Sequence, residues 1–252
     1  MTQKPDVAIV TGGSRGIGAA CCLLLAKAGC LVVVNYVANA QAAKAIVTQI
    51  EKAGGKAVAV QGDVASERDI MALFMAADQY GRLKILINNA GVIDLKSRVD
   101  EMPVERLERM FAINITGSFL CAREAIKRMS TRHGGQGGAI VNLSSAAATL
   151  GAPGWFVDYA ASKGAIDTFT IGLAREVAAE GIRVNAVRPG IIDTEIHASG
   201  GEPDRVAQMR SQIPMQREGT ALEVAEAIVW LASDKASYVT GACLSVSGGR
   251  SN

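Results

Sequence analysis

Tyr159 and Lys163 are the residues whose types and spacing most clearly suggest chemistry. Residues four apart on a helix share one face, and the small and apolar residues around this pair are typical of a helix. A phenol ordinarily titrates near pH ~10, and a cation beside it favours the phenolate and lowers its pKa. Such a tyrosine can exchange a proton near neutral pH. The same spacing also describes an ordinary pair on a helix surface.

The composition restricts the class of protein. Of the 252 residues, 49% are hydrophobic and 4% aromatic, which predicts an aliphatic core. The 26 basic and 24 acidic side chains nearly balance, so we expect no nucleic acid and no membrane as partner. No apolar run is long enough to span a bilayer, and the first residues lack a signal-peptide core. These features predict a cytoplasmic protein.

The five cysteines and two histidines form no metal-binding pattern. Cys-x-x-Cys spacing is absent, and every cysteine lies in apolar surroundings, as reduced and buried thiols do. His133 and His197 have no partners at ligand spacing. We therefore predict no metal site.

Short aliphatic runs alternate with helix-length segments along the chain. The runs predict strands at residues 7–10, 31–34, 57–60, 85–87, 139–143, 182–187 and 243–246. The segments between them predict helices at residues 16–28, 40–53, 67–80, 104–129, 159–179 and 221–232. Apolar strands that alternate with helices are typical of a parallel sheet covered on both faces. We predict a single α/β domain over residues 1–252, built on a doubly wound parallel sheet of about seven strands.

A glycine-rich loop, residues 11–18, follows the first predicted strand. Its glycines permit a tight turn and a close approach to a pyrophosphate, which would lie at the N-terminus of the next helix. The spacing is Gly-x-x-x-Gly-x-Gly, not the common Gly-x-Gly-x-x-Gly, and a plain turn is the alternative. The position between a strand and a helix favours dinucleotide binding.

The ends of the next strands bear on the choice of cofactor. Proteins that prefer NAD usually carry an acidic residue after the second strand, whereas a nearby arginine suits the 2′-phosphate of NADP. Asn35 is neutral and Arg15 lies in the neighbouring loop, so we predict NADP(H) over NAD(H); a solvated Arg15 is the alternative. Asp63 has the chemistry to accept a hydrogen bond from adenine, but Asp also favours turns and helix caps.

Several motifs follow one another in order from about residue 7 to residue 248: residues 11–18, residues 88–91, Asn114, Ser145, Tyr159 with Lys163, and Pro189 with Gly190. Together they resemble the short-chain dehydrogenase/reductase family. Within it, the sequence is most similar to the branch that contains 3-oxoacyl-carrier-protein reductases and glucose 1-dehydrogenases. The resemblance implies a Rossmann-type fold, a homotetramer, and hydride transfer between a nicotinamide cofactor and a small carbonyl or secondary alcohol substrate.

The resemblance also implies roles for individual residues. Tyr159 is the general acid/base, and Lys163 lowers its pKa and binds the nicotinamide ribose. Ser145 polarises the carbonyl or hydroxyl, and Asn114 anchors a water in the proton relay. The implied cofactor contacts are Gly12, Ser14, Arg15, Gly16, Ile17, Gly18, Asn35, Asp63, Val64, Asn89, Ala90, Gly91, Tyr159, Lys163, Pro189, Gly190, Ile192 and Thr194.

One departure concerns the serine. Ser145 stands fourteen residues before Tyr159, one more than is usual in the family. Alignment from the strand side selects Ser145 and places the extra residue in the loop 151–158, whereas counting back from Tyr159 selects Ala146, which has no hydroxyl. We assign Ser145 to the site and Ser144 to a structural position at the strand end.

The segment 189–215 is rich in glycine and proline and carries apolar residues, which predicts a mobile lid over the substrate; a surface excursion with a short helix near residues 204–212 is the alternative. Trp155 and Phe156 are candidates for a pocket wall, a subunit contact or a cover of the core. The family's tetramers pair helices equivalent to residues 104–129 and 159–179.

The leading expectation is an enzyme: an NAD(P)-dependent oxidoreductase that acts on a ketone or acyl thioester. The alternatives are a sugar or polyol dehydrogenase and a nucleotide-binding regulator without turnover. A regulator has no reason to keep Ser145, Tyr159 and Lys163 together. A basic surface for an acyl carrier protein is conceivable at Arg123, Lys127, Arg128 and Arg132, although the same spacing describes a solvated helix face.

Overall fold

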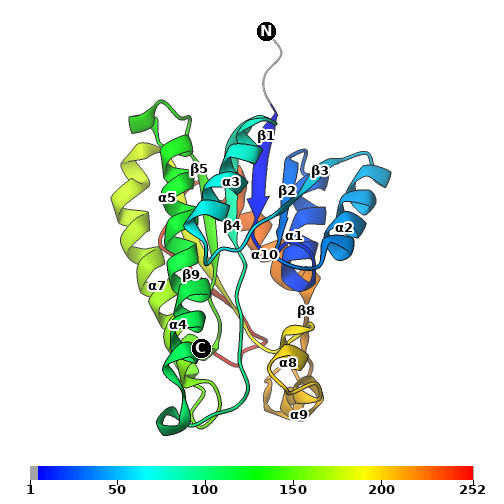
Figure 1. The fold of residues 1–252 in the computed structure, drawn as a ribbon, viewed down its shortest axis with the longest axis vertical. Coiled ribbons are helices and arrows are strands. Elements are labelled where there is room, and N and C mark those ends of the chain that lie inside the picture. The colour runs from blue at the N-terminus through cyan, green and yellow to red at the C-terminus, as the bar shows by residue number, and fades with distance from the viewer. Residues whose placement is uncertain (1–4, 252) are drawn as a thin grey trace.

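The structure, a computed structural model, describes residues 5–251 apart from the side chain of His197. Seven parallel strands form one sheet in the order β3-β2-β1-β4-β5-β6-β9, with helices on both sides (Figure 1). The strands are β1 (Asp6–Val10), β2 (Leu31–Tyr36), β3 (Lys56–Gln61), β4 (Arg82–Asn88), β5 (Gly138–Leu143), β6 (Ile182–Pro189) and β9 (Cys243–Val246). The predicted α/β fold and its seven strands are confirmed.

Helices cover both faces of the sheet because the strands are apolar on both. In β1, Ala8 and Val10 join one buried core and Val7 and Ile9 join the other, as the alternation of side chains along a strand requires. Three helices pack on the first face: α1 (Gly16–Lys27), α2 (Ala40–Lys52) and α10 (Ala221–Ala232). Three pack on the second: α3 (Glu67–Asp78), α5 (Gly117–Met129) and α7 (Val157–Val177). No helix of the described residues is long and apolar enough to cross a bilayer.

The strand order reverses at β1, which lies between β2 and β4. Val10 pairs with Val34 of β2 on one side and with Ile87 of β4 on the other. Connections that leave neighbouring strands at such a point run to opposite faces of the sheet and open a crevice at the carboxyl ends. The loops after β1 and β4 both face this crevice.

The prediction of one continuous α-helix over residues 104–129 is wrong in the middle of this range. α4 (Val104–Phe111) and α5 are separated by a π-helical turn at Ala112–Thr116, in which the Gly117 N–H bonds a carbonyl five residues earlier. A π turn accommodates one extra residue within a helix, so the pattern of helix-forming residues does not reveal it.

Tertiary contacts account for the π turn. The Asn114 side chain bonds both backbone groups of Val92, accepting from its N–H at 2.8 Å and donating to its carbonyl at 3.0 Å. Only glycine fits at position 117, directly after the turn, because a Cβ there would lie 2.7 Å from the Val64 carbonyl. The loop after β4 and the turn after β3 therefore both hold the helix at this point.

Residues 189–215 fold into short elements. They are β7 (Ile192–Asp193), α8 (Ile196–Ser199), α9 (Arg205–Met209) and a 3-10 turn at Arg210–Gln212. β7 pairs with β8 (Gly219–Thr220), which precedes α10. A short helix near residues 204–212, which belonged to the alternative reading of this segment, is present, and the mobile lid stays a prediction.

An ion pair joins α4 to the start of α7. The Arg106 Nε lies 2.7 Å from the Asp158 Oδ2, and the two side chains are 8% and 0% exposed. Arg106 also donates to the Leu95 carbonyl at 2.6 Å, so it fastens the loop after β4 as well. Asp158 precedes Tyr159, and this pair thereby fixes the first turn of α7.

We predict that Asp158→Asn destabilises the fold by roughly 3 kcal/mol, because it leaves a poorly hydrated arginine without its counter-charge. The matched control is Asp100→Asn, which removes an aspartate from an Arg98 pair whose side chains are 71% and 69% exposed. Exposed pairs contribute about 0–1 kcal/mol, so the control should unfold almost like the wild type. Urea unfolding measures both; equal midpoints for the two variants would refute the structural role of Asp158.

Candidate active site

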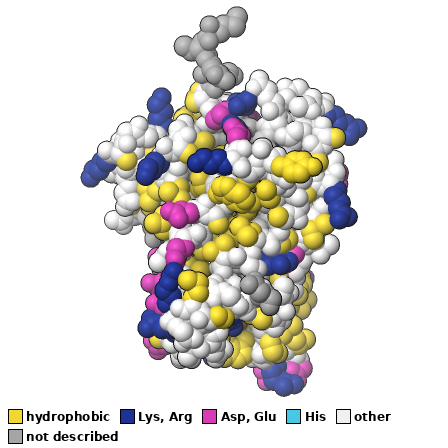
Figure 2. All heavy atoms as spheres, turned by 180° about the vertical axis from the view of Figure 1, so that it is seen from behind, with side chains coloured by type: hydrophobic (Ala, Val, Ile, Leu, Met, Phe, Trp, Pro, Cys, Tyr) yellow, Lys and Arg dark blue, Asp and Glu magenta, His cyan; other side chains and the backbone are white. Residues whose placement is uncertain are grey.

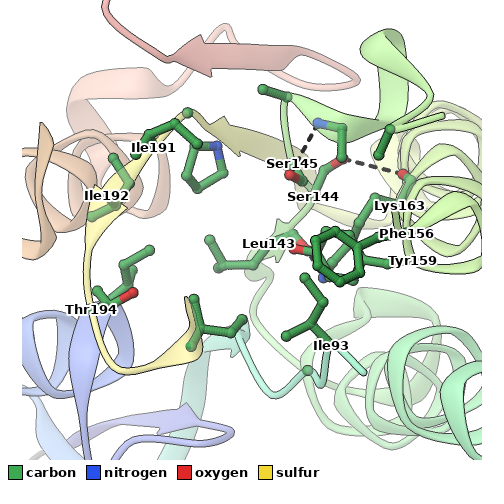
Figure 3. A pocket seen from close by; sticks show the side chains of 18 of the residues that line it. Ile93, Leu143, Ser144, Ser145, Phe156, Tyr159, Lys163, Ile191, Ile192 and Thr194 are labelled. Atoms are coloured by element: carbon green, nitrogen blue, oxygen red, sulfur yellow. Dashed lines mark hydrogen bonds between the residues drawn. The ribbon is translucent and has the colours of Figure 1, made fainter. Parts of the chain in front are cut away.

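A cavity lies beyond the carboxyl ends of the strands (Figure 3). Ser145, Tyr159 and Lys163 lie on one side of it and Ile192 and Thr194 on the other. The first three come from the end of β5 and from α7, and the last two from β7 and the turn after it. The cavity therefore stands between two segments that are distant in sequence.

Two hydrogen bonds hold α7 against the end of β5. The Lys163 ammonium donates to the Leu143 carbonyl at 2.7 Å, and the Ser144 hydroxyl donates to the Lys163 carbonyl at 3.1 Å. Lys163 is 4% exposed, so its charge needs this acceptor. Ser144 has the structural position expected for it.

The electrostatics of Tyr159 differ from the expectation. Burial raises the pKa of the Tyr159 phenol, and the Ser145 hydrogen bond and the charge of Arg205 oppose this only in part. Burial lowers the pKa of Lys163 to about 8, with a partial offset from Asp167. The ammonium points to the Leu143 carbonyl and lies 5.6 Å from the centre of the Tyr159 ring. The pKa of Tyr159 is therefore shifted in the direction opposite to the one that the spacing suggested.

Ser145 faces the cavity beside Tyr159. Its hydroxyl accepts from the Ala147 N–H at 3.1 Å, at the start of the short helix α6 (Ala147–Leu150). Ala146 also lines the cavity but carries no hydroxyl. After α6 the backbone turns through positive φ at Gly151, Ala152 and Gly154. The loop that was expected to contain the extra residue thus has three backbone positions with positive φ.

Asn114 is 1% exposed and connects the loop after β4 to α7. Besides its two bonds to Val92, it donates to the Ser162 hydroxyl at 3.1 Å. Ser162 in turn donates to the Tyr159 carbonyl at 2.7 Å. The side chain of Asn114 therefore acts on the backbone that carries Tyr159 and does not line the cavity.

The glycine loop has the shape that a dinucleotide requires. A Cβ on Gly18 would lie 2.3 Å from the Gly12 carbonyl, so only glycine allows this close approach. The first turn of α1 has no side-chain cap and no acidic residue, which leaves its N–H groups free for a phosphate. Asn89 donates to the carbonyls of Thr11 and Gly12 at 2.8 Å and 3.0 Å, which fastens the loop to the end of β4. The residues present fit a nicotinamide dinucleotide.

Asn35, Asp63 and Val64 have structural partners of their own. Asn35 is buried; its side chain accepts from the Gly12 N–H at 3.2 Å and donates to the Gly62 carbonyl at 2.9 Å. Asp63 accepts from the Ala65 N–H at 2.9 Å, which is the turn that the sequence left as an alternative. Val64 is buried against α5. Asn35 thus supports the glycine loop from beneath.

The other predicted contacts divide into two groups. Ile17, Asn89, Gly91, Pro189, Gly190, Ile192 and Thr194 line the same cavity as Tyr159 and Lys163. Gly12, Ser14, Arg15 and Ala90 belong to the loops after β1 and β4, and Gly16 and Gly18 to the first turn of α1. A Cβ on Gly91 would lie 3.5 Å from the Lys163 ammonium, so a larger residue there would narrow the cavity.

Arg205, Arg250 and Ile93 are among the lining residues that were not assigned from the sequence. Arg205 comes from α9 and Arg250 from the segment after β9. Neither lies in a recognisable motif, and only the fold brings them to the cavity. Phe156 is 1% exposed and lines it too, so it forms the pocket wall that was one of its three alternatives.

Known proteins resemble this chain along nearly its whole length. A sequence model of the family described as enoyl-(acyl carrier protein) reductase matches residues 12–251. The uncharacterized oxidoreductase YgfF of Escherichia coli is 58% identical over 97% of this chain and 99% of its own length. The chain belongs to the short-chain dehydrogenase/reductase family. It is therefore an oxidoreductase by family.

Other members of the short-chain dehydrogenase/reductase family show its range. Glucose 1-dehydrogenase 2 of Bacillus subtilis is 40% identical over 96% of this chain and 93% of its own length. The crystal structure of a short-chain dehydrogenase from Burkholderia cenocepacia in complex with NADP is 31% identical, with a TM-score of 0.89, and the match covers 99% of this chain and 98% of that one. The NADP-bound structure shares the Rossmann-type fold of this chain.

We predict that one lysine side chain of the cofactor-free protein titrates near pH 8, well below the ~10.4 of an ordinary lysine. Burial disfavours the charged form, so Lys163 is an ammonium below this pH and a neutral amine above it. Carbon-13 NMR of labelled lysine measures the titration. The signal should vanish in Lys163→Met, and titration of every lysine above pH ~10 would contradict the burial argument.

Proposed function

We propose that this enzyme catalyses NADP(H)-dependent interconversion of a carbonyl and a secondary alcohol. The observation that carries the proposal is the convergence of Ser145, Tyr159 and Lys163 on one cavity, whose other side borders the glycine loop. A bound nicotinamide cofactor supplies or accepts the hydride. The protein then has to position the reacting carbon and manage a single proton.

The proton belongs to Tyr159. Since burial raises its pKa, the phenol is protonated near neutral pH and is ready to donate to an oxygen that gains negative charge. Ser145 hydrogen-bonds the phenol and offers a second hydroxyl donor to the same oxygen. Lys163, on the same face of α7, provides positive charge beneath the ring and donors for the nicotinamide ribose. Asn114 keeps α7 in place through Ser162.

The cofactor preference rests on the charges around the end of β2. Asn35 is neutral and engaged with the backbone, so no carboxylate at that position would repel a 2′-phosphate. Arg15 is exposed at the N-terminal end of α1, close to where the adenosine ribose of a cofactor on this loop would lie. The NADP complex of the Burkholderia cenocepacia relative supports the same choice.

The expected basic surface for an acyl carrier protein is largely neutralised. Arg123 pairs with Glu67 at 2.5 Å, Lys127 with Glu124 at 2.7 Å, and Arg128 with Asp78 at 2.8 Å. Since carboxylates already meet these cations, we favour a small free substrate over a carrier-bound one. Cytoplasmic location is part of the proposal: the described cysteines are all free thiols and most are buried.

A homotetramer is also part of the proposal. Phe119 of α5 and Phe169 of α7 stack at 3.7 Å, and Phe119 is 46% exposed. A Cβ on Gly164 or Gly172 of α7 would meet open space, so another helix has room to approach closely there. Figure 2 shows further apolar side chains gathered on the face seen from behind. These exposed apolar side chains support the association of several copies of the chain.

We predict that Tyr159→Phe lowers turnover by about 10²–10⁴-fold because the proton donor is lost. NADPH binding should persist, since the ring still covers Lys163. The assay is NADPH oxidation with a panel of ketones, aldehydes and sugars, with cofactor binding measured by fluorescence. Tyr238→Phe, at a fully exposed position, is the matched control. Wild-type turnover in Tyr159→Phe, or no turnover of any substrate by the wild type, would refute the proposal.

We predict that Arg15→Ala weakens NADPH binding by about tenfold and leaves NADH binding unchanged, because only NADPH carries the 2′-phosphate. Lys27→Ala, an exposed cation at the other end of α1, is the matched control. Calorimetric titration with both cofactors measures the effect. An equal loss for NADH and NADPH would place Arg15 elsewhere on the cofactor.

A further inference from the structure

Two arginines that hydride transfer does not require line the cavity. Arg205 reaches it from α9 and Arg250 from the segment after β9, and Tyr159 and Ser145 line the same cavity. Arginines within a cavity bring positive charge and fixed N–H donors to whatever binds there. Their presence beside the reacting groups therefore bears on the substrate.

Arg205 is held in place by aromatic rings. Its guanidinium lies 4.9 Å from the centre of the Phe156 ring and 5.4 Å from that of Trp155. Cation–π contacts of this kind hold the guanidinium in place without using its N–H donors. The Arg205 Nε is buried and has no hydrogen-bond partner among the described residues.

Neither arginine forms an ion pair with a carboxylate in the described part of the chain. The charge of Glu202 raises the pKa of Arg205 slightly, but the Glu202 carboxylate forms its ion pair with Lys96, at 2.6 Å. Two other partly buried arginines pair with carboxylates, Arg106 with Asp158 and Arg188 with Asp167 at 2.9 Å, and Arg183 donates to the backbone carbonyls of Leu231 and Ser233. The cavity thus holds uncompensated positive charge.

The two cations also disfavour one another. Burial lowers the pKa of Arg205, and the charge of Arg250 lowers it further, against smaller opposing effects of Tyr159 and Glu202. Burial lowers the pKa of Arg250 as well. An anion between them would relieve this repulsion, and a charge-assisted bidentate contact is among the strongest that a side chain makes.

We infer that the substrate carries an anionic group, a carboxylate or a phosphate ester, which Arg205 and Arg250 bind while its carbonyl or hydroxyl meets Tyr159 and Ser145. Ile93, Ala152 and Ile196 also line the cavity, and these apolar side chains fit a short aliphatic stem. This inference rests on the proposed function and narrows its substrates to oxo or hydroxy acids and sugar or ketone phosphates. Neutral sugars and neutral ketones would be poorer substrates.

The test compares matched substrates. The wild type and Arg205→Met are both assayed. The rates of reduction of pyruvate, acetoacetate and levulinate are compared with those of their methyl esters, and the rate for dihydroxyacetone phosphate is compared with that for dihydroxyacetone. We expect the wild type to prefer the anions, and Arg205→Met to lower kcat/KM for them by about 10–100-fold with the neutral partners nearly unchanged. Arg250→Met should act in the same direction. Arg210→Met, in an exposed pair with Glu218, is the matched control.

A second measurement needs no turnover. Trp155 contacts Arg205, so in a Trp230→Phe background its emission should report binding of butanoate but not of butanamide. Arg205→Met should abolish the response, and phosphate in place of butanoate distinguishes the two kinds of anion.

Equal kcat/KM for acids and esters, or equal losses for both in Arg205→Met, would reduce Arg205 to a stacking role and overturn the inference. Weaker NADPH binding in Arg205→Met, with no change in substrate preference, would do so too by assigning the arginine to the cofactor. Absence of turnover with any carbonyl, together with butanoate binding that depends on Arg205, would refute the proposed function and keep the anion site.

Discussion

The contact between Lys163 and the end of β5 is the constraint on which the site depends. The side chain of Lys163 donates to the Leu143 carbonyl, and its own carbonyl accepts from Ser144. A buried ammonium without an acceptor is strongly destabilising. If α7 moved along the sheet, the Lys163 ammonium would lose its acceptor and the protein would be destabilised. Because Tyr159 lies one turn away on the same helix, its phenol is fixed relative to Ser145 by the same contact.

Buried polar side chains extend this anchoring across the carboxyl edge of the sheet. Asn88 donates to the Asn142 side chain at 3.0 Å, and Asn142 donates to the Thr170 hydroxyl of α7 at 2.9 Å. Next to them, the Thr11 hydroxyl accepts from the Asn89 N–H at 3.0 Å and ties the glycine loop to β4. Each group is satisfied by its neighbour, so the network specifies one arrangement of β1, β4, β5 and α7.

Most of the fold and the central pair of the site could be predicted from the sequence. Strands with two apolar faces appear as short aliphatic runs, and residues on one helix face recur at a fixed spacing. Tyr159 and Lys163 share a face for purely local reasons. The sequence was less informative where distant segments decide the outcome. The pKa of Tyr159 follows from its burial, Asn35 is occupied by the Gly12 backbone, and Arg205 reaches the cavity only through the fold. None of these depends on residues nearby in the chain.

The π turn at Ala112–Thr116 has a consequence for how this site can evolve. Loss of one residue from the turn would restore a regular helix and rotate α4 by about a hundred degrees against α5. Arg106 would then leave Asp158, and Asn114 would leave Val92 and Ser162. Descendants of this sequence can replace many surface residues of α4 and α5, but they cannot shorten the helix here without dismantling the support of Tyr159.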